Sequence, residues 1–372
     1  MRVDKSKWHK YKLEDLCTNG SSNIVISKVE IGKGIYPLYG ASGIIGNIDF
    51  FHQDKEYVGV VKDGSGVGRI AKYPAYSSLV GTMQYIFPKD NTNIDYLRYL
   101  LESLNLAKYV KGAAIPHIYF RHYKTEHTFL PPLIEQQAIA SELDTLQKMI
   151  DGYKAQIADL DVLAQSIFVD TFGNVAVNDK CWDIIQMGQL GNFKNGLNYS
   201  KGEIGKPLKI IGVGDFQNIK CLSSFDNISY INIEDISQEY LLHNEDIVFV
   251  RSNGNKNLVG RCLEVFPNST EVTFSGFCIR FRKSVEIINK YLIATLTDIG
   301  FKNTHILKSN GIGIQNINQK LLSSLPIPVP PIGMQKKYAA QVEAIEKQKE
   351  LIRQQLADAE TLMKERMQYY FS

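Results

Sequence analysis

Two long stretches of the chain carry apolar side chains at alternating steps of four and three residues. In the first stretch this spacing begins at Ile139 and continues through four heptads to Ile167. Such a repeat places one apolar stripe along a helix and is typical of a coiled-coil seam. It predicts a helix from about residue 134 to about 168, roughly 50 Å long at about 1.5 Å per residue. The predicted seam consists of Ile139, Leu143, Leu146, Ile150, Tyr153, Ile157, Leu160, Ala164 and Ile167.

The same pattern occurs a second time, 199 residues further along the chain. The run Phe129–Gln136 (FLPPLIEQ) returns as Pro328–Gln335 (PVPPIGMQ), and the apolar positions that follow keep the same register. This duplication predicts a molecule with two similar functional domains. The second predicted seam consists of Tyr338, Val342, Ile345, Lys349, Ile352, Leu356, Ala359, Met363 and Arg366.

Neither apolar stripe would be stable in water, so each helix needs a partner. The first helix leaves one block of the chain and enters the next, whereas the second ends the chain. Antiparallel pairing would therefore bury both seams within one molecule, and we predict two long antiparallel coiled-coil helices. Lys349 interrupts the second seam. It either fixes the register of the pair at some cost in stability or extends its ammonium group to solvent.

The blocks that precede the two helices repeat more loosely. Each opens near a tryptophan, Trp8 or Trp182, and Val61–Arg69 corresponds to Val250–Arg261. Their interiors consist of short β-branched and aromatic runs separated by Gly, Asn and Asp, which predict a mixed α/β fold. The predicted strands are Tyr57–Lys62, Gln84–Phe87, Asp246–Arg251 and Cys278–Arg282.

These patterns divide the chain into four segments. We predict α/β domains at residues 1–130 and 173–329, related by an approximate two-fold axis. Helical segments are predicted at residues 131–172 and 330–372. One framework carrying two different surfaces suits the recognition of two different half-targets.

Charge is distributed unevenly between these segments. The net charge is only +3, but residues 134–170 hold seven acids against two lysines, and residues 332–372 hold seven bases against six acids. Blocks 1–133 and 171–331 therefore carry +7 between them. Moderately basic blocks joined by an acidic helix indicate that the blocks, rather than the helices, face a polyanion.

Composition narrows the class of protein further. Hydrophobic residues make up 44% and charged residues 22% of the 372 positions, as in a globular protein. No apolar run is long enough to span a membrane and the N-terminus lacks an apolar signal core, so we expect a cytoplasmic protein. The five scattered cysteines contain no C-x-x-C pair, and no metal site is predicted.

The combination of these motifs resembles the DNA-specificity subunit of bacterial type I restriction-modification systems. Leu130–Gln137 (LPPLIEQQ), with a heptad helix that ends in Gln165–Gly173 (QSIFVDTFG), resembles the central helical region of that family. Tyr36–Gly46 (YPLYGASGIIG) resembles a common stretch of its target-recognition domains. The second copy departs from the pattern at Gly333-Met334, where an acidic residue is expected.

The resemblance implies a subunit that reads an asymmetric, two-part site in double-stranded DNA. Each α/β block would be a target-recognition domain for one half-site, and the helices would set the unspecified gap between the half-sites. The implied partners are two methyltransferase subunits, which use S-adenosylmethionine and dock on the helices, and restriction and translocase subunits. No cofactor is expected in this chain itself. A specificity subunit of a related two-part-site restriction or phage-defence system is the alternative.

The chain itself is not predicted to be an enzyme. Adenine methylation in the resembling systems needs an N/D-P-P-Y/F loop beside the flipped base, and neither Pro-Pro pair here has those neighbours. Gly64–Gly68 is the one stretch that looks like a phosphate-binding loop. A turn is the simpler interpretation, because the corresponding stretch Asn253–Asn257 has lost most of the glycines.

Candidate DNA-binding residues are polar and basic side chains in the loops between predicted strands. Arg, Lys, Asn and Gln read base edges in the major groove, and Lys, Arg and Ser hold phosphates. Each candidate is equally compatible with an ordinary solvated surface residue. In the first block they are Lys62, Ser65, Arg69, Lys111, His117 and Arg121; in the second they are Arg251, Asn253, Asn255, Lys256, Asn257, Arg261, Lys308, Asn310 and Gln315.

Two further interpretations stay open on the sequence alone. A coiled-coil scaffold would need no basic, divergent blocks, and in a shift assay with its partners present it would show no sequence-specific DNA binding. A phosphate-loop enzyme would bind a nucleotide through Gly64–Gly68, which equilibrium dialysis would detect.

Overall fold

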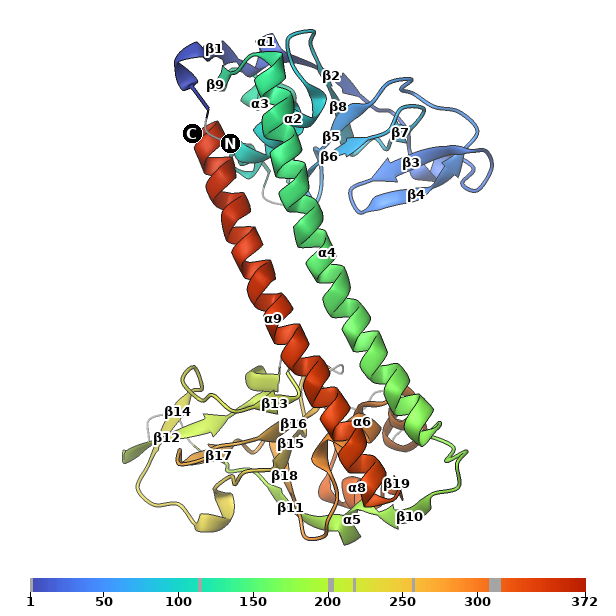
Figure 1. Cartoon of the computed structure of the whole chain (residues 1–372), viewed down its shortest axis with the longest axis vertical. Coiled ribbons are helices and arrows are strands. Elements are labelled where there is room, and N and C mark those ends of the chain that lie inside the picture. Colours follow the sequence, from blue (N-terminus) through green and yellow to red (C-terminus); the bar gives the residue numbers. More distant parts are fainter. Residues whose placement is uncertain (1–2, 113–115, 200–203, 217–218, 256–257, 308–315) are drawn as a thin grey trace. The chain divides into compact units, whose positions relative to one another are not determined.

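The computed structural model describes residues 3–112, 116–199, 204–216, 219–255, 258–307 and 316–372 (Figure 1). The chain forms two compact units. Unit 1 comprises residues 1–156 and 352–372, and unit 2 comprises residues 157–351. Among the described residues no helix is both long and apolar enough to cross a bilayer.

The two predicted long helices are present as α4 (Leu133–Phe172) and α9 (Ile332–Phe371), each of 40 residues. Helix α4 continues one turn beyond the predicted end near residue 168. Phe168 and Phe172 explain this extension, because both rings are fully buried in unit 2 and contact Tyr291 and Tyr338. Tertiary packing therefore stabilises a last turn that the heptad spacing alone does not predict.

In unit 1, the first part of α4 packs antiparallel to the last part of α9. Glu142 Oε2 accepts a hydrogen bond from Tyr370 Oη at 2.9 Å, and Glu142 Oε1 lies 3.1 Å from Arg366 Nε. Further along α4, Lys154 pairs with Glu360 at 2.9 Å. As residue numbers rise on α4 they fall on α9, which is the predicted antiparallel arrangement.

In unit 2, the last part of α4 packs antiparallel to the first part of α9. Phe168 and Phe172 contact Tyr338, and Asp161 contacts Lys349. Every residue of the two predicted seams is buried or partly buried in its unit. The buried seam residues are Ile139, Leu143, Leu146, Ile150, Tyr338, Ile345, Lys349, Ile352 and Ala359.

Lys349 does not extend to solvent. Its residue is 5% exposed, and its Nζ lies 2.7 Å from Asp161 and 2.9 Å from Glu346. Burial lowers the pKa of Lys349, but the hydrogen bonds to the two carboxylates raise it by more, so the net pKa lies above the usual lysine value. The solvent-directed alternative is therefore wrong, and the contact with Asp161 links one register position of α9 to α4.

The described residues of unit 1 form three sheets beside the helices. The largest has the strand order β2-β8-β5-β6, and all its neighbours are antiparallel. A second has the order β4-β3-β7, and a two-stranded ladder joins β1 to β9. The elements are β1 (His9–Lys12), α1 (Leu13–Leu16), β2 (Cys17–Ser21), β3 (Tyr36–Gly40), β4 (Gly43–Ile48), β5 (Tyr57–Val61), β6 (Ile70–Tyr73), β7 (Ser78–Leu79), β8 (Met83–Pro88), α2 (Ile94–Ser103), α3 (Phe120–Tyr123) and β9 (His127–Leu130).

Unit 2 repeats this plan. Its main sheet has the order β11-β18-β15-β16-β13, where the first four strands match β2-β8-β5-β6 in order and direction. Its second sheet is β14-β12-β17, and β10 pairs with β19. The elements are β10 (Asp183–Gln186), α5 (Met187–Leu190), β11 (Gly191–Asn195), β12 (Lys206–Ile211), β13 (Cys221–Leu222), β14 (Tyr230–Ile233), β15 (Asp246–Val250), β16 (Cys262–Val265), β17 (Val272–Phe274), β18 (Cys278–Lys283), α6 (Asn289–Thr297), α7 (Ile299–Phe301), α8 (Gln319–Ser323) and β19 (Pro326–Val329).

The four predicted strands are confirmed as β5, β8, β15 and β18, each within one residue of its predicted ends. Their burial follows from their composition. All five residues of β5 and all five of β15 are buried, as expected for strands covered on both faces, and the one charged member, Asp246, pairs with Arg282 at 2.7 Å.

A buried glutamine ties each long helix to its unit. Gln136 is fully buried; its Nε2 donates to the carbonyls of Pro131 and Asn91, and its Oε1 accepts from the Asn93 amide. In unit 2, Gln335 Nε2 donates to Pro330 at 2.8 Å, and its Oε1 accepts from the Ile288 amide at 3.0 Å. The repeated Pro-Pro-x-x-x-Gln run thus fixes the start of the helix against the segment leading into α2 or α6.

The two copies differ where the second motif departs from the first. Trp8 Nε1 donates to Glu135 Oε2 at 3.1 Å in unit 1. The position that corresponds to Glu135 is Met334, whose thioether sulfur is only a weak acceptor. Trp182 Nε1 donates instead to the Phe172 carbonyl at 2.9 Å. The two tryptophans therefore correspond in sequence, but their indole N–H groups have different hydrogen-bond acceptors.

We expect Gln136→Ala to lower the free energy of unfolding by about 2–4 kcal/mol, because it leaves buried backbone groups without partners. Gln137→Ala is the matched control, because this neighbour is exposed on the same helix and its side chain makes no hydrogen bond among those of the described residues. Urea unfolding of both variants would measure the difference. Equal losses would show that the buried hydrogen bonds are not the cause.

Candidate nucleic-acid interface

The glycine-rich stretch of unit 1 is the turn between β5 and β6. The amides of Val67, Gly68 and Arg69 donate to the carbonyls of Gly64, Val61 and Gly66. The Gly64 amide donates to Pro116 at 3.0 Å. A phosphate-binding loop needs its amides to point at the ligand, whereas these four are already used within the protein. The stretch is therefore a turn, as the simpler interpretation predicted.

Three segments that are distant in sequence meet at Lys62. The Lys62 amide donates to Thr82, in the turn before β8, at 2.9 Å. The Lys62 carbonyl accepts from Ile118 at 2.8 Å, and the segment that holds Ile118 is fixed by a pair of hydrogen bonds between Lys111 and His117. This arrangement brings Lys62, Lys111 and His117 to one region of unit 1.

A groove of about 440 Å³ opens beside Lys62. It lies between β2, the ends of β5 and β8, and the segment around α3. Its lining contains three bases, no acid, and several polar or aromatic side chains that can hydrogen-bond or stack. The lining residues are Asn19, Gly20, Ser21, Lys62, Gln84, Tyr119, Phe120, Arg121 and Lys124.

The surroundings of the groove are electropositive. Burial, followed by the positive charges of Lys111 and Arg121, lowers the pKa of the nearby His122. Arg121 lies over the ring of Tyr119 at 4.5 Å from its centroid, which holds the guanidinium beside the groove. Lys124 pairs with Glu14 at 2.8 Å, so part of its charge is compensated. An anion is the ligand that such a groove favours.

Two of the six residues predicted in unit 1, Lys62 and Arg121, line the groove, and Lys111 and His117 belong to the segment that borders it. Ser65 and Arg69 lie on the β5–β6 turn and are not part of the lining. Sequence reasoning missed the remaining side chains of the groove. The aromatic-basic run Tyr119–Tyr123 was a usable signal for some of them, but β2 is brought beside β8 only by strand pairing.

Unit 2 holds Arg251 in the same framework that holds Lys62 in unit 1. The Arg251 amide donates to Phe277 and its carbonyl accepts from Ile317, both at 2.8 Å. The amide of Gly260 donates to Val250 at 3.0 Å, as Gly68 does to Val61 at 2.9 Å. The backbone of the candidate surface is therefore the same in both units, while its side chains differ.

The described candidates of unit 2 have different local roles. Arg251 is half-buried and its Nη1 lies 3.3 Å from the Gly276 carbonyl. Asn253 Oδ1 accepts from the Asn255 amide at 2.7 Å, so this side chain shapes its own turn. Arg261 Nη1 lies 3.5 Å from the Phe216 carbonyl. The predicted residues Lys256, Asn257, Lys308, Asn310 and Gln315 lie outside the described residues.

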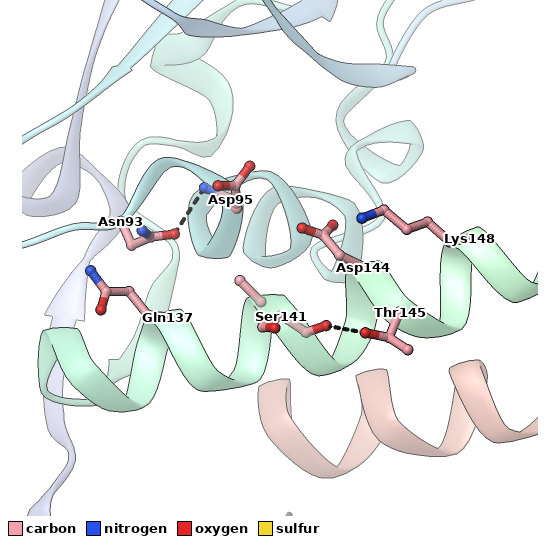
Figure 2. Close-up of a pocket in the computed structure, with 8 residues that line it drawn as sticks. Asn93, Asp95, Gln137, Ser141, Asp144, Thr145 and Lys148 are labelled. Atoms are coloured by element: carbon pink, nitrogen blue, oxygen red, sulfur yellow. Dashed lines mark hydrogen bonds between the residues drawn. The ribbon is translucent and has the colours of Figure 1, made fainter.

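A second hollow, of about 270 Å³, lies on the helical part of unit 1. Figure 2 shows Asp144 and Lys148 on the side of α4 that faces the start of α2, where Asp95 lies. Asp144 Oδ1 accepts from Arg98 and Tyr99 of α2 at 2.7 and 2.8 Å. This carboxylate therefore fastens α2 to α4, and a hollow that contains two acids does not suit a polyanion.

One family model matches two long segments of the chain. The model of the type I restriction modification DNA specificity domain matches residues 5–161 and again residues 179–361. The chain belongs to this family, and the two matches coincide with the internal repeat. The resemblance seen in the sequence is confirmed.

Curated relatives carry names of the same kind. The StySPI specificity subunit of Salmonella potsdam is 25% identical over 67% of this chain. The EcoKI specificity subunit of Escherichia coli strain K12 is 24% identical over 67% of the chain. The chain spans somewhat more than half of these two relatives, 57% and 56%. A putative MjaX specificity subunit of Methanocaldococcus jannaschii is 24% identical over 87% of this chain and 77% of its own length.

Solved structures share the fold. The S subunit of a type I restriction-modification system from M. genitalium has a TM-score of 0.63 at 16% identity, over 100% of this chain and 98% of that one. A chain from a study of complex assembly and conformational transition of the type I R-M system has a TM-score of 0.55 at 15% identity, over 97% of both chains. The predicted mixed α/β fold with two long helices is confirmed.

Arg121→Ala should weaken binding of a mixed-sequence DNA duplex by the full chain about threefold to tenfold at moderate salt. It should also reduce the slope of log K against log salt concentration by about one, as loss of one phosphate contact does. The control Lys10→Ala removes one positive charge from an exposed position of β1 that does not line the groove. Equal effects of the two variants across a salt titration would remove Arg121 from the interface.

Proposed function

We propose that the chain is the sequence-specificity subunit of a type I restriction-modification complex and reads a two-part, asymmetric site in double-stranded DNA. The observation that carries this proposal is one backbone framework displaying unlike side chains in the two units. Lys62 and Arg251 occupy the same hydrogen-bonded position, and so do Thr82 and Phe277. Each unit would thus read its own half-site with the same geometry and different chemistry.

Within unit 1, the groove beside Lys62 would hold the DNA. Lys62 and Arg121 would contact phosphates or the acceptor-rich edge of guanine. Asn19 and Ser21 would add hydrogen-bonding groups from the edge strand β2. In unit 2, Arg251 would take the place of Lys62, and its planar guanidinium would present paired donors in a fixed geometry that an ammonium group does not have.

The long helices would set the unspecified gap between the half-sites. Each 40-residue helix is about 60 Å long at about 1.5 Å per residue. B-DNA rises about 3.4 Å per base pair, so such a helix matches about 17 base pairs. This length suits a bipartite site with its gap included.

Catalysis would belong to partner subunits. Two methyltransferase subunits that use S-adenosylmethionine would dock on the helices, and restriction and translocase subunits would complete the complex. In this chain the segments around both Pro-Pro pairs serve the fold, since the Pro131 and Pro330 carbonyls are bound by Gln136 and Gln335. No group of three metal-ligating His, Cys, Asp or Glu side chains occurs among the described residues.

Genomic methylation sequencing in a host with and without the gene tests the proposal directly. We expect one asymmetric two-part motif to be methylated only when the gene is present. Restoring the gene should restore the same motif. An unchanged methylome, with the partner subunits expressed, would contradict the proposed function.

Removing one heptad from both helices tests the spacer role. Deleting residues 150–156 together with residues 354–360 keeps the seam in register, because Lys154 and Glu360 are paired in the parent. We expect the gap to shorten by up to about three base pairs, at about 3.4 Å per pair, while the half-site bases stay the same. Methylation sequencing reads both quantities.

The control for that deletion is Lys154→Ala with Glu360→Ala, which removes the same ion pair at constant length. It should leave the gap unchanged. New half-site bases at an unchanged gap in the deletion variant would contradict the spacer role.

A further inference from the structure

Phe277 is an aromatic side chain displayed at the candidate surface of unit 2. It lies in the turn between β17 and β18, is 63% exposed, and belongs to none of the hydrophobic clusters formed by the described residues. A single exposed apolar residue is ordinary on a protein surface. What distinguishes Phe277 is its position beside Arg251.

The backbone around Phe277 is held from several sides. Its carbonyl accepts from the Arg251 amide at 2.8 Å. The preceding Gly276 amide donates to Leu197 at 2.7 Å, and the following Cys278 amide donates to Ser275 at 2.8 Å. The Gly276 carbonyl also lies 3.3 Å from Arg251 Nη1. The ring is therefore presented on a fixed turn, with the guanidinium of Arg251 against the same turn.

Unit 1 has the same position with a different side chain. Thr82 accepts hydrogen bonds through its carbonyl from the amides of Lys62 and Asp63, at 2.9 and 3.2 Å, and its side chain is exposed. Thr82 thus corresponds to Phe277 as Lys62 corresponds to Arg251. The backbone at this position makes the same hydrogen bond in both units, while the exposed side chain differs. A position of this kind allows two units with one backbone geometry to recognise different bases.

We propose that Phe277 is a specificity-determining residue of unit 2 that contacts the 5-methyl group of a thymine in the major groove. The inference rests on the proposed function and deepens it. A phenyl ring can neither donate nor accept a hydrogen bond, and the thymine methyl is the apolar group that base edges present in the major groove. Arg251, against the same turn, supplies the polar contact to a neighbouring base or phosphate.

The test uses the full chain assembled with its methyltransferase subunits and a duplex that contains the methylated motif. Each thymine of the motif is replaced in turn by deoxyuridine, which removes only the methyl group. The parent complex should lose about threefold to tenfold in affinity at one thymine, as expected for burial of one methyl group against an aromatic ring.

Phe277→Ala should weaken binding to the thymine duplex by about tenfold and should then be insensitive to deoxyuridine at that position. Phe277→Thr introduces the residue type that unit 1 has at the corresponding position, Thr82, so it should fold normally. It should also lose affinity for the thymine duplex. Tyr230→Ala is the control, because Tyr230 is 70% exposed on β14 of the same unit and is not hydrogen-bonded to the Arg251 turn. It should keep both the affinity and the deoxyuridine effect.

Two results would overturn the inference while leaving the proposed function intact. One is a parent complex that binds its motif specifically but is indifferent to deoxyuridine at every thymine, or a motif that contains no thymine. The other is a Phe277→Ala complex that keeps the full deoxyuridine effect. Failure of the parent complex to prefer the motif over unrelated DNA would count instead against the proposed function.

Discussion

The mutual burial of two apolar stripes is the interaction on which the rest of the structure depends. Within unit 1, Ile139 and Leu143 of α4 share a core with Tyr370 of α9; within unit 2, Phe168 and Phe172 of α4 share a core with Tyr338 of α9. Unit 1 therefore completes its core only with residues from the end of the chain. Contacts of such long sequence separation carry a loop-closure entropy cost, which the burial of these apolar side chains has to offset.

The duplication preserves hydrogen-bonding roles more faithfully than it preserves residues. Tyr96 and Tyr291 both donate to a carbonyl of the strand before a long helix, and Gln136 and Gln335 both close the turn after a Pro-Pro pair. Buried polar groups without partners are costly, so these positions tolerate little change. The exposed positions between them are under no such constraint, which leaves Lys62 and Arg251 able to differ within one geometry.

The acids of the long helix and the bases of the α/β blocks have different roles. Several acids of α4 are used inside their own unit, as Glu142 is with Arg366, Asp144 with Arg98, and Asp161 with Lys349. The groove beside Lys62 contains bases and no acid in its lining. Part of the negative charge of α4 is thus neutralised by ion pairs within its own unit, whereas the lining of the groove keeps an excess of positive charge.

The sequence by itself determined the long helices, the internal repeat, the four clearest strands and the family, because heptad spacing, Pro-Pro boundaries and alternating runs are local patterns that repeat along the chain. The tertiary structure alone decided that Lys349 is buried between two carboxylates, that Trp8 and Trp182 have different partners, and that Asn19 and Gln84 join Arg121 in one groove. These facts depend on pairing between strands and helices far apart in sequence. Local periodicity contains no information about such pairing, since it fixes which face of an element is buried but not which neighbour covers it.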